Sequence, residues 1–122
     1  MALRKSYRIK KEKEFQLVYS TKNSVANRYF VIYRITKEEQ VHFRVGISVG
    51  KKISKLAVDR NRIKRYLTQV IYNHRDEIDN NVDLIIIARK KSLELNQSGI
   101  EKNLLHCLHL ARVISHQKEN DG

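Results

Sequence analysis

The sequence predicts an α/β two-layer sandwich in which helices cover a small central sheet, with elements in the order α-β-β-α-β-α. Three observations favour this class. Two stretches, at residues 29–35 and 42–49, are rich in β-branched and aromatic residues. A stretch with helical spacing follows them, and after it come a continuous apolar run at 82–88 and a second helical stripe. The chain has 122 residues, and we expect one domain over 1–115 and a disordered tail over 116–122.

The first half of the chain predicts a short helix and two strands. Residues 12–20 place Phe15, Val18 and Tyr19 at helical spacing, but a helix of this length depends on the rest of the fold for its stability. The residues at 36–40, between the two strand-like stretches, are polar, as in a hairpin loop. We therefore expect the two strands to form an antiparallel hairpin.

The second half predicts a parallel β-α-β unit. From residue 57 to about 73, four apolar side chains share one helical face: Ile63, Leu67, Val70 and Ile71. The run DLIIIA at 83–88 is typical of a strand buried on both faces in the middle of a sheet. Because the helix can serve as a crossover, we expect this strand to pair in parallel with the strand at 42–49. Strand and helix chirality alone favours a right-handed crossover.

A last helix is expected to begin near Ser98, since Ser98 and Glu101 have the spacing of a capping box. Its apolar stripe consists of Ile100, Leu104, Cys107, Leu108, Ala111 and Ile114. Cys107 is the single cysteine of the chain, so no internal disulfide is possible. Its apolar neighbours favour a buried, unreactive thiol.

The charge of the chain indicates a polyanionic partner. The formal net charge is +12, from 25 Lys and Arg against 13 Asp and Glu. Basic residues gather in two blocks: residues 1–13 hold six with one acid, and residues 51–65 hold seven with one acid. The longest apolar run, 84–88, is far too short to span a bilayer, and no apolar stretch follows the basic N-terminus. We therefore expect a nucleic-acid partner, no membrane association, no secretion signal and a cytoplasmic location.

The second basic block falls largely on the predicted middle helix. On a helical wheel, Asn61, Lys64 and Arg65 lie on one flank of its apolar face, Arg62 points nearly opposite the core, and Arg60 lies at the edge. Arginine forks match phosphate geometry, and asparagine can donate to and accept from base edges or 2′-hydroxyls. A purely solvated face would leave seven cations compensated only by one acid. The predicted RNA contacts are Lys51, Lys52, Arg60, Asn61, Arg62, Lys64 and Arg65.

These residues also carry a family resemblance. The string RNRIKR at 60–65 resembles the signature of the bacterial ribonuclease P protein, and the segments 24–31, 46–52 and 85–89 resemble the blocks around it. The resemblance covers most of the chain, from about residue 7 to 111. It implies an accessory subunit of a ribonucleoprotein endonuclease that binds the catalytic RNA and the single-stranded 5′ leader of precursor tRNA. It also implies a left-handed crossover, against the physical expectation.

By the same resemblance, a cleft between the first helix and the sheet receives the leader, and Phe15, Tyr19, Val31 and Tyr33 line it. Aromatic rings that stack on bases tolerate any base sequence, as a leader site requires. All four side chains can alternatively be ordinary core. The chain departs from many members at Gly50 and in the loop 54–58, so contacts of that loop cannot be carried over.

Catalytic chemistry is not expected on this chain. The acid pairs Glu12 with Glu14 and Asp76 with Glu77 lie in charged segments typical of solvated surface, and His106 with His109 has no third metal ligand in a supporting pattern. We therefore expect no catalytic residue, no metal site and no cofactor on the protein, with Mg²⁺ bound through the RNA subunit. No obligate protein partner is evident. The alternative functions are a ribosomal protein or a general RNA chaperone.

Overall fold

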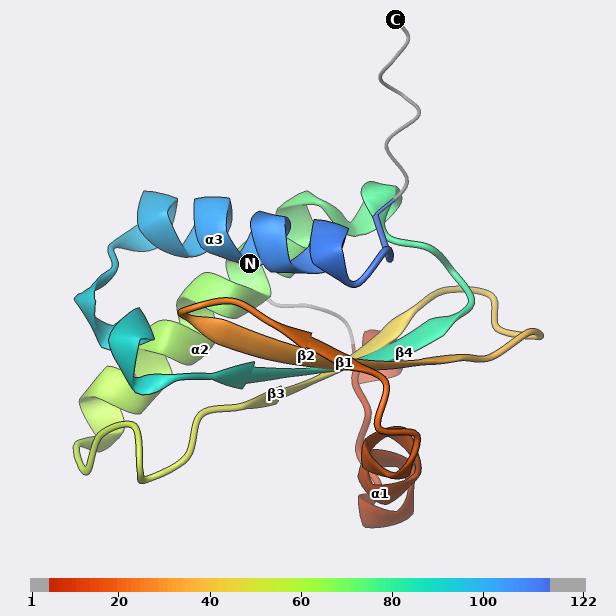
Figure 1. Cartoon of the computed structure of the whole chain (residues 1–122), viewed down its shortest axis with the longest axis horizontal. Helices are drawn as coiled ribbons and strands as arrows, with labels where there is room; N and C mark the ends of the chain where they lie inside the picture. Colours follow the sequence, from red (N-terminus) through yellow and green to blue (C-terminus); the bar gives the residue numbers. More distant parts are fainter. Residues whose placement is uncertain (1–4, 115–122) are drawn as a thin grey trace, which may run out of the picture.

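The computed structural model describes residues 5–114 and shows a four-stranded mixed sheet with three helices around it (Figure 1). The fold class predicted from the sequence is confirmed. In chain order the elements are η1 (Lys5–Tyr7), α1 (Glu12–Ser20), β1 (Ser24–Ala26), β2 (Phe30–Thr36), β3 (Arg44–Ser48), α2 (Ala57–Asn73), η2 (Arg75–Glu77), β4 (Val82–Ala88), η3 (Lys90–Glu94) and α3 (Gln97–Leu110). The predicted tail at 116–122 lies outside the described residues.

The sheet has the order β1-β2-β4-β3. Strand β4 pairs with β3 in parallel, as predicted, and with β2 antiparallel, from Phe30 opposite Ala88 to Thr36 opposite Val82. The predicted β2–β3 hairpin is therefore wrong, because β4 lies between these two strands. A strand that is apolar on both faces is most stable in the centre, where it hydrogen-bonds on both sides. The short strand β1, which pairs with β2, was not predicted.

The two faces of the sheet are covered unequally. Helices α2 and α3 pack on one face and enclose the main core, which contains all four predicted apolar residues of α2 and the stripe of α3. Helix α1 lies on the opposite face, as Figure 1 shows. There Val18, Ile85 and Ile9 form a second, smaller cluster, against which Phe15 and Tyr33 pack. The two-layer arrangement thus describes the main core, and α1 adds a partial cover behind it.

Helix α3 begins one residue after Asn96, whose Oδ1 accepts a hydrogen bond from the N–H of Gly99 at 2.9 Å. The cap predicted at Ser98 is therefore wrong, because asparagine caps a helix as well as serine does and stands two residues earlier. Glu101 does not close a capping box. Its Oε2 lies 2.8 Å from Nε2 of His74, and Oε2 of Glu77 lies 2.9 Å from the Nδ1 of the same ring.

His74 therefore links the end of α2 to α3 and η2. Burial lowers the pKa of His74, but the hydrogen bonds and charges of Glu101 and Glu77 outweigh it, so the pKa lies above its usual value. The buried thiol predicted for Cys107 is confirmed: its side chain is fully enclosed, and burial raises its pKa to about 11.

Candidate nucleic-acid interface

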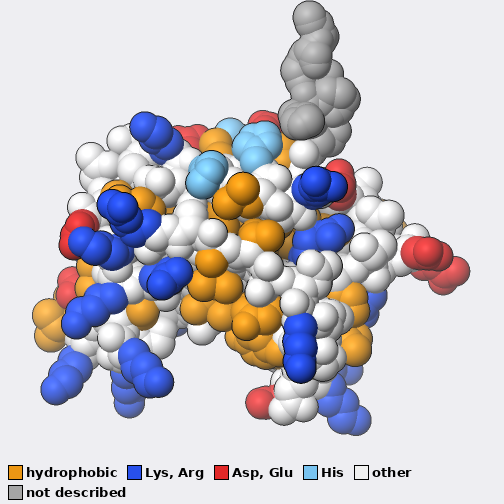
Figure 2. Space-filling model, in the orientation of Figure 1, with side chains coloured by type: hydrophobic (Ala, Val, Ile, Leu, Met, Phe, Trp, Pro, Cys, Tyr) orange, Lys and Arg blue, Asp and Glu red, His pale blue; other side chains and the backbone are white. Residues whose placement is uncertain are grey.

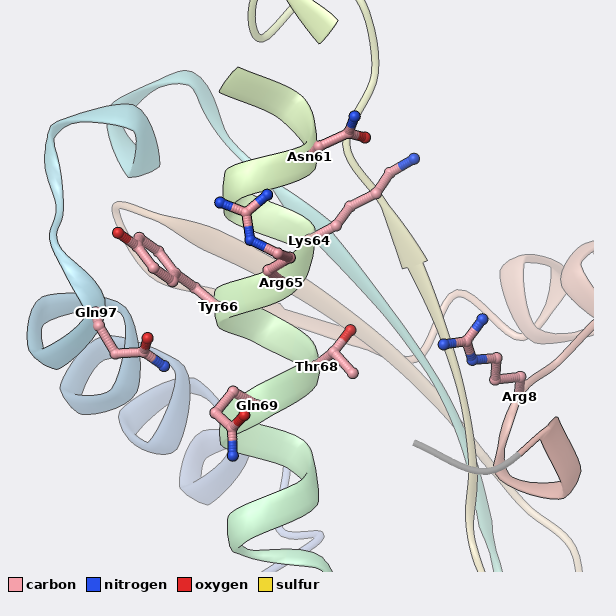
Figure 3. A pocket seen from close by; sticks show the side chains of 8 residues that line it. All are labelled: Arg8, Asn61, Lys64, Arg65, Tyr66, Thr68, Gln69 and Gln97. Atoms are coloured by element: carbon pink, nitrogen blue, oxygen red, sulfur yellow. The ribbon is translucent and has the colours of Figure 1, made fainter. Parts of the chain in front are cut away.

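The outward flank of α2 borders a hollow of about 690 Å³. Asn61, Lys64 and Arg65 are exposed along this flank, as the helical wheel predicts. Figure 3 shows their side chains spread over the surface of α2, with Arg8 facing them from the segment before α1. We call this space the basic hollow; its lining is Arg8, Asn61, Lys64, Arg65, Tyr66, Thr68, Gln69 and Gln97.

The two other arginines of the block have structural contacts. Nη1 of Arg60 donates to the carbonyl of Ser54 at 2.8 Å, so this side chain braces the loop before α2. Nη2 of Arg62 donates to the carbonyl of Leu93 at 3.4 Å, and among the described residues its buried Nε has no hydrogen-bond partner. The outward orientation predicted for Arg62 is therefore wrong. Element η3 covers the side of α2 that the wheel assigns to solvent.

Lys51 and Lys52 are exposed in the turn that follows β3. The turn is closed by a hydrogen bond from the N–H of Ile53 to the carbonyl of Gly50 at 3.0 Å. Further along, the Ser54 hydroxyl donates to Oδ2 of Asp59 at 2.9 Å. The single acid of the basic block thus orders the entry to α2, and it lies in the first turn, where the helix dipole favours a negative charge.

A second hollow, of about 300 Å³, lies between α1, β3 and α2. We call it the cleft; its lining is Arg8, Ile9, Phe15, Val45, Gly46, Ile47, Lys64 and Thr68. The ring of Phe15 lies directly over Gly46, since a Cβ built on Gly46 would come within 2.5 Å of Phe15 Cε1. Any larger residue at this position would displace the ring.

Of the four residues predicted to contact the leader, only Phe15 lines the cleft defined above. Tyr19 and Tyr33 contact each other edge to face, with ring centroids 5.0 Å apart, and Tyr19 remains 37% exposed. Val31 is half-buried two residues before Tyr33, on the same face of β2. These three side chains lie on the α1 face of the sheet, beyond the wall of the cleft.

An ion network holds α1 against the sheet. Arg44 on β3 donates from Nε and Nη2 to the two carboxylate oxygens of Asp83 at 3.1 and 2.6 Å, and from Nη1 to Glu14 on α1 at 2.9 Å. Asp83 is fully buried, and Lys37 lies 3.7 Å from it. The hydrogen bond from Arg44 lowers the pKa of Glu14, and the hydrogen bond to Asp83 raises that of Arg44. Through this fork, charged hydrogen bonds join α1 to the sheet beside its small apolar cluster.

Charge is distributed unevenly over the molecule. Figure 2 shows Lys and Arg side chains gathered at the end that carries η3 and the loop before α2. The loop between β2 and β3 lies at the opposite end and carries the exposed acids Glu38 and Glu39. Among residues 5–114, no acidic side chain lines the basic hollow or the cleft. Both hollows therefore favour a negatively charged ligand.

Sequence reasoning did not select several residues that line these hollows. Arg8 belongs to the first basic block, which drew attention by its charge alone. Tyr66, Gln69 and Gln97 are single polar residues whose meeting depends on how α2 and α3 pack. A pattern along one helix carries no signal for such a contact.

Proteins similar to this chain share one description. A family model described as Ribonuclease P matches residues 3–112. The chain belongs to this family. The ribonuclease P protein component of Lactobacillus helveticus is 54% identical over 112 residues, which cover 92% of each chain. The structure of the Staphylococcus aureus RNase P protein is 42% identical, with a TM-score of 0.84, and covers 91% of this chain and 100% of that one. For the RNase P protein from Thermotoga maritima the identity is 26%, the TM-score 0.75 and the coverage 88% and 98%.

Within residues 5–114 of this ribonuclease P protein, no group of three or more His, Cys, Asp or Glu side chains could hold a metal ion. Two of the acids that the sequence offers in pairs are engaged elsewhere, Glu14 with Arg44 and Glu77 with His74. None of the helices described is long and apolar enough to cross a membrane. The two hollows present cations, amides and aromatic rings to a ligand.

Proposed function

We propose that this chain, as the accessory subunit of the endoribonuclease ribonuclease P, binds the catalytic RNA at the basic hollow and the 5′ leader of precursor tRNA at the cleft. The observation that carries the proposal is that the two hollows adjoin and that the part of the chain described by the structure contributes no acid to the lining of either. One has cations and amides for a folded RNA, and the other has an aromatic wall for a single strand.

The RNA subunit would be held mainly by phosphate contacts. Lys64, Arg65 and Asn61 are exposed and point away from the core. Lys51 and Lys52 are exposed in the loop that leads into the same helix. Arg60 and Arg62 are half-buried, so they can contribute only their outer donors and the shape of the surface. Each phosphate neutralised on a duplex changes the slope of log affinity on log salt by about −0.9.

The leader would be held by stacking and by its backbone. Phe15 presents its ring in the cleft, and Tyr19 and Tyr33 continue the aromatic surface on the same face of the sheet. Stacking one base on such a ring is worth about 1–3 kcal/mol and requires no particular base. Holding the leader positions the scissile bond in the active site of the RNA.

Phosphodiester cleavage would be the work of the RNA, with the Mg²⁺ ions bound there, and the protein would act where precursor tRNA is processed, in the cytoplasm. Nothing in the fold or in the comparisons supports a ribosomal protein or a general RNA chaperone.

The test is reconstitution with a bacterial ribonuclease P RNA at low Mg²⁺. Adding the protein should restore cleavage of precursor tRNA, because its cations screen the repulsion between two phosphate backbones. Charge reversal at Lys64 and Arg65 should weaken assembly with the RNA and flatten the salt slope. Lys102→Glu is the matched control, since Lys102 is exposed on α3 and lines neither hollow. Absence of restored cleavage with the folded wild-type protein contradicts the proposal.

A further inference from the structure

The basic hollow and the cleft share one wall. Arg8, Lys64 and Thr68 line both of them, and we call these three residues the seam. In Figure 3, Arg8 extends from the segment before α1 toward the flank of α2 that carries Lys64 and Thr68, and the Lys64 side chain points toward the Asn61 end of that flank. A strand that leaves the cleft toward the RNA subunit would therefore pass over the seam.

Arg8 is anchored by the sheet. It forms a parallel bridge with Val45 on β3, and the N–H of the next residue, Ile9, donates to the carbonyl of Val45 at 3.0 Å. Ile9 and Val45 are 5% and 2% exposed. The backbone at residue 8 is thus fixed at the edge of β3, while the side chain of Arg8 is exposed and extends toward the flank of α2. When Arg8 binds, its backbone therefore needs no further ordering, and only the rotamers of the side chain become fixed.

We propose that Arg8 and Lys64 together bind one backbone phosphate of the leader at the seam, where the leader passes from the cleft to the RNA subunit. This inference rests on the proposed function and adds to it a residue from the first basic block. Arg8 and Lys64 border the same two hollows from different elements, and the flexible stem of Lys64 lets its ammonium turn toward a phosphate held by the guanidinium fork of Arg8. The Thr68 hydroxyl can donate to the same oxygens.

The position of the seam gives Arg8 a specific task. Leader and RNA subunit are both polyanions, and at the seam they would lie within one Debye length, about 8 Å at physiological salt. Two cations on the shared wall reduce this repulsion where it is strongest. Arg8 also lines the basic hollow, but Asn61, Lys64 and Arg65 remain there when it is lost. Loss of Arg8 should therefore weaken binding of the leader much more than assembly with the RNA subunit.

The experiment measures binding of precursor tRNA to the holoenzyme assembled from the protein and a bacterial ribonuclease P RNA. Substrates carry a leader of either about ten nucleotides or one nucleotide. The variant is Arg8→Ala, and Arg8→Gln is a second variant that keeps part of the stem. The matched control is Lys10→Ala, because Lys10 is exposed on the same segment and lines neither hollow.

We expect both Arg8 variants to weaken binding of the long leader about three- to tenfold and to reduce the salt slope by about one phosphate. Binding of the one-nucleotide leader and assembly with the RNA should change less than twofold, and Lys10→Ala should change neither. Neutral methylphosphonate linkages are then placed one at a time along the leader. At one position, the neutral linkage should weaken binding to the wild-type holoenzyme by about the same three- to tenfold factor and should leave the affinity of the Arg8 variants unchanged.

Two outcomes separate this inference from the proposed function. If the wild type binds long and short leaders equally, the leader cleft itself is wrong. If the wild type binds the long leader more tightly than the short one, the leader cleft stands. The phosphate site at the seam is then overturned by any of three results for the Arg8 variants: an equal loss of affinity for both leaders, no loss of affinity, or a loss of assembly with the RNA instead. A neutral linkage that stays costly in the Arg8 variants at every position overturns it as well.

Discussion

Replacing Gly46 by alanine places one methyl group against the ring of Phe15. A Cβ at Gly46 would lie 2.5 Å from Phe15 Cε1 and 2.7 Å from Cζ, whereas carbon atoms in ordinary contact are about 3.5–4.0 Å apart. The ring must therefore move by about 1 Å, away from β3, and the wall of the cleft moves with it.

The expected losses of stability and of leader affinity both follow from the displacement of the Phe15 ring. The ring is the far end of a half-buried side chain, so the free energy of unfolding should fall by about 1 kcal/mol, the low end for overpacking, and Tm by about 4 °C. A displaced ring loses stacking worth about 1–3 kcal/mol per base, which is about fivefold to 150-fold in affinity for a long leader. Assembly with the catalytic RNA should stay unchanged, because the basic flank of α2 is untouched.

The assay compares the affinity of the reconstituted holoenzyme for long-leader and one-nucleotide-leader precursor tRNA. Gly50→Ala is the matched control, since a Cβ at Gly50 has no atom within 4 Å. In a Phe15→Ala background, Gly46→Ala should cost nothing further, because no ring remains to be displaced. An equal loss in both backgrounds would refute the claim that Gly46 acts through Phe15.

Two further predictions concern stability. The raised pKa of His74 means that its links to Glu77 and Glu101 stabilise the fold fully below the ordinary histidine pKa of about 6.5, and that this stabilisation is lost as pH rises through the raised value. Thermal melts of His74→Gln and wild type between pH 5.5 and 9 should differ most at the acidic end; a constant difference contradicts the linkage. Asn96→Ala should lower the free energy of unfolding by about 1 kcal/mol, while Ser98→Ala, measured by the same urea titration, should cost clearly less. A larger loss of stability in Ser98→Ala than in Asn96→Ala would show that Ser98, and not Asn96, caps the helix.

The sequence predicted those elements whose pattern is local. Helix α2 was placed at its observed bounds because its apolar face repeats over several turns. Strand β4 was placed in mid-sheet because the five residues after Asp83 are all apolar, without the polar alternation of a strand that has one exposed face. The hairpin between β2 and β3 failed for the opposite reason. Two strands joined by a short polar loop are compatible with direct pairing, and only the position of β4, more than forty residues further along the chain than the end of β2, excludes it.

For the candidate site, too, the sequence predicted the residues whose direction is set by one helix and missed those whose position depends on contacts between elements. Asn61, Lys64 and Arg65 lie where the helical wheel places them, because one helix alone decides their direction. Arg62 is not exposed as the wheel predicts, because it donates to the carbonyl of Leu93 on η3, and a helical wheel does not include neighbouring elements. Arg8 was missed as a site residue because its position depends on a bridge to β3 that no periodicity announces.

The attachment of α1 has a consequence for motion. This helix is held by one small apolar cluster and by the Arg44–Asp83–Glu14 network, whereas α2 and α3 share the main core. Opening α1 exposes little apolar surface, so its amide hydrogens should exchange with solvent well before those of α2 and β4. The cleft therefore has one rigid wall and one yielding wall. Purines and pyrimidines differ in size, and a yielding wall lets the same aromatic surface close on either.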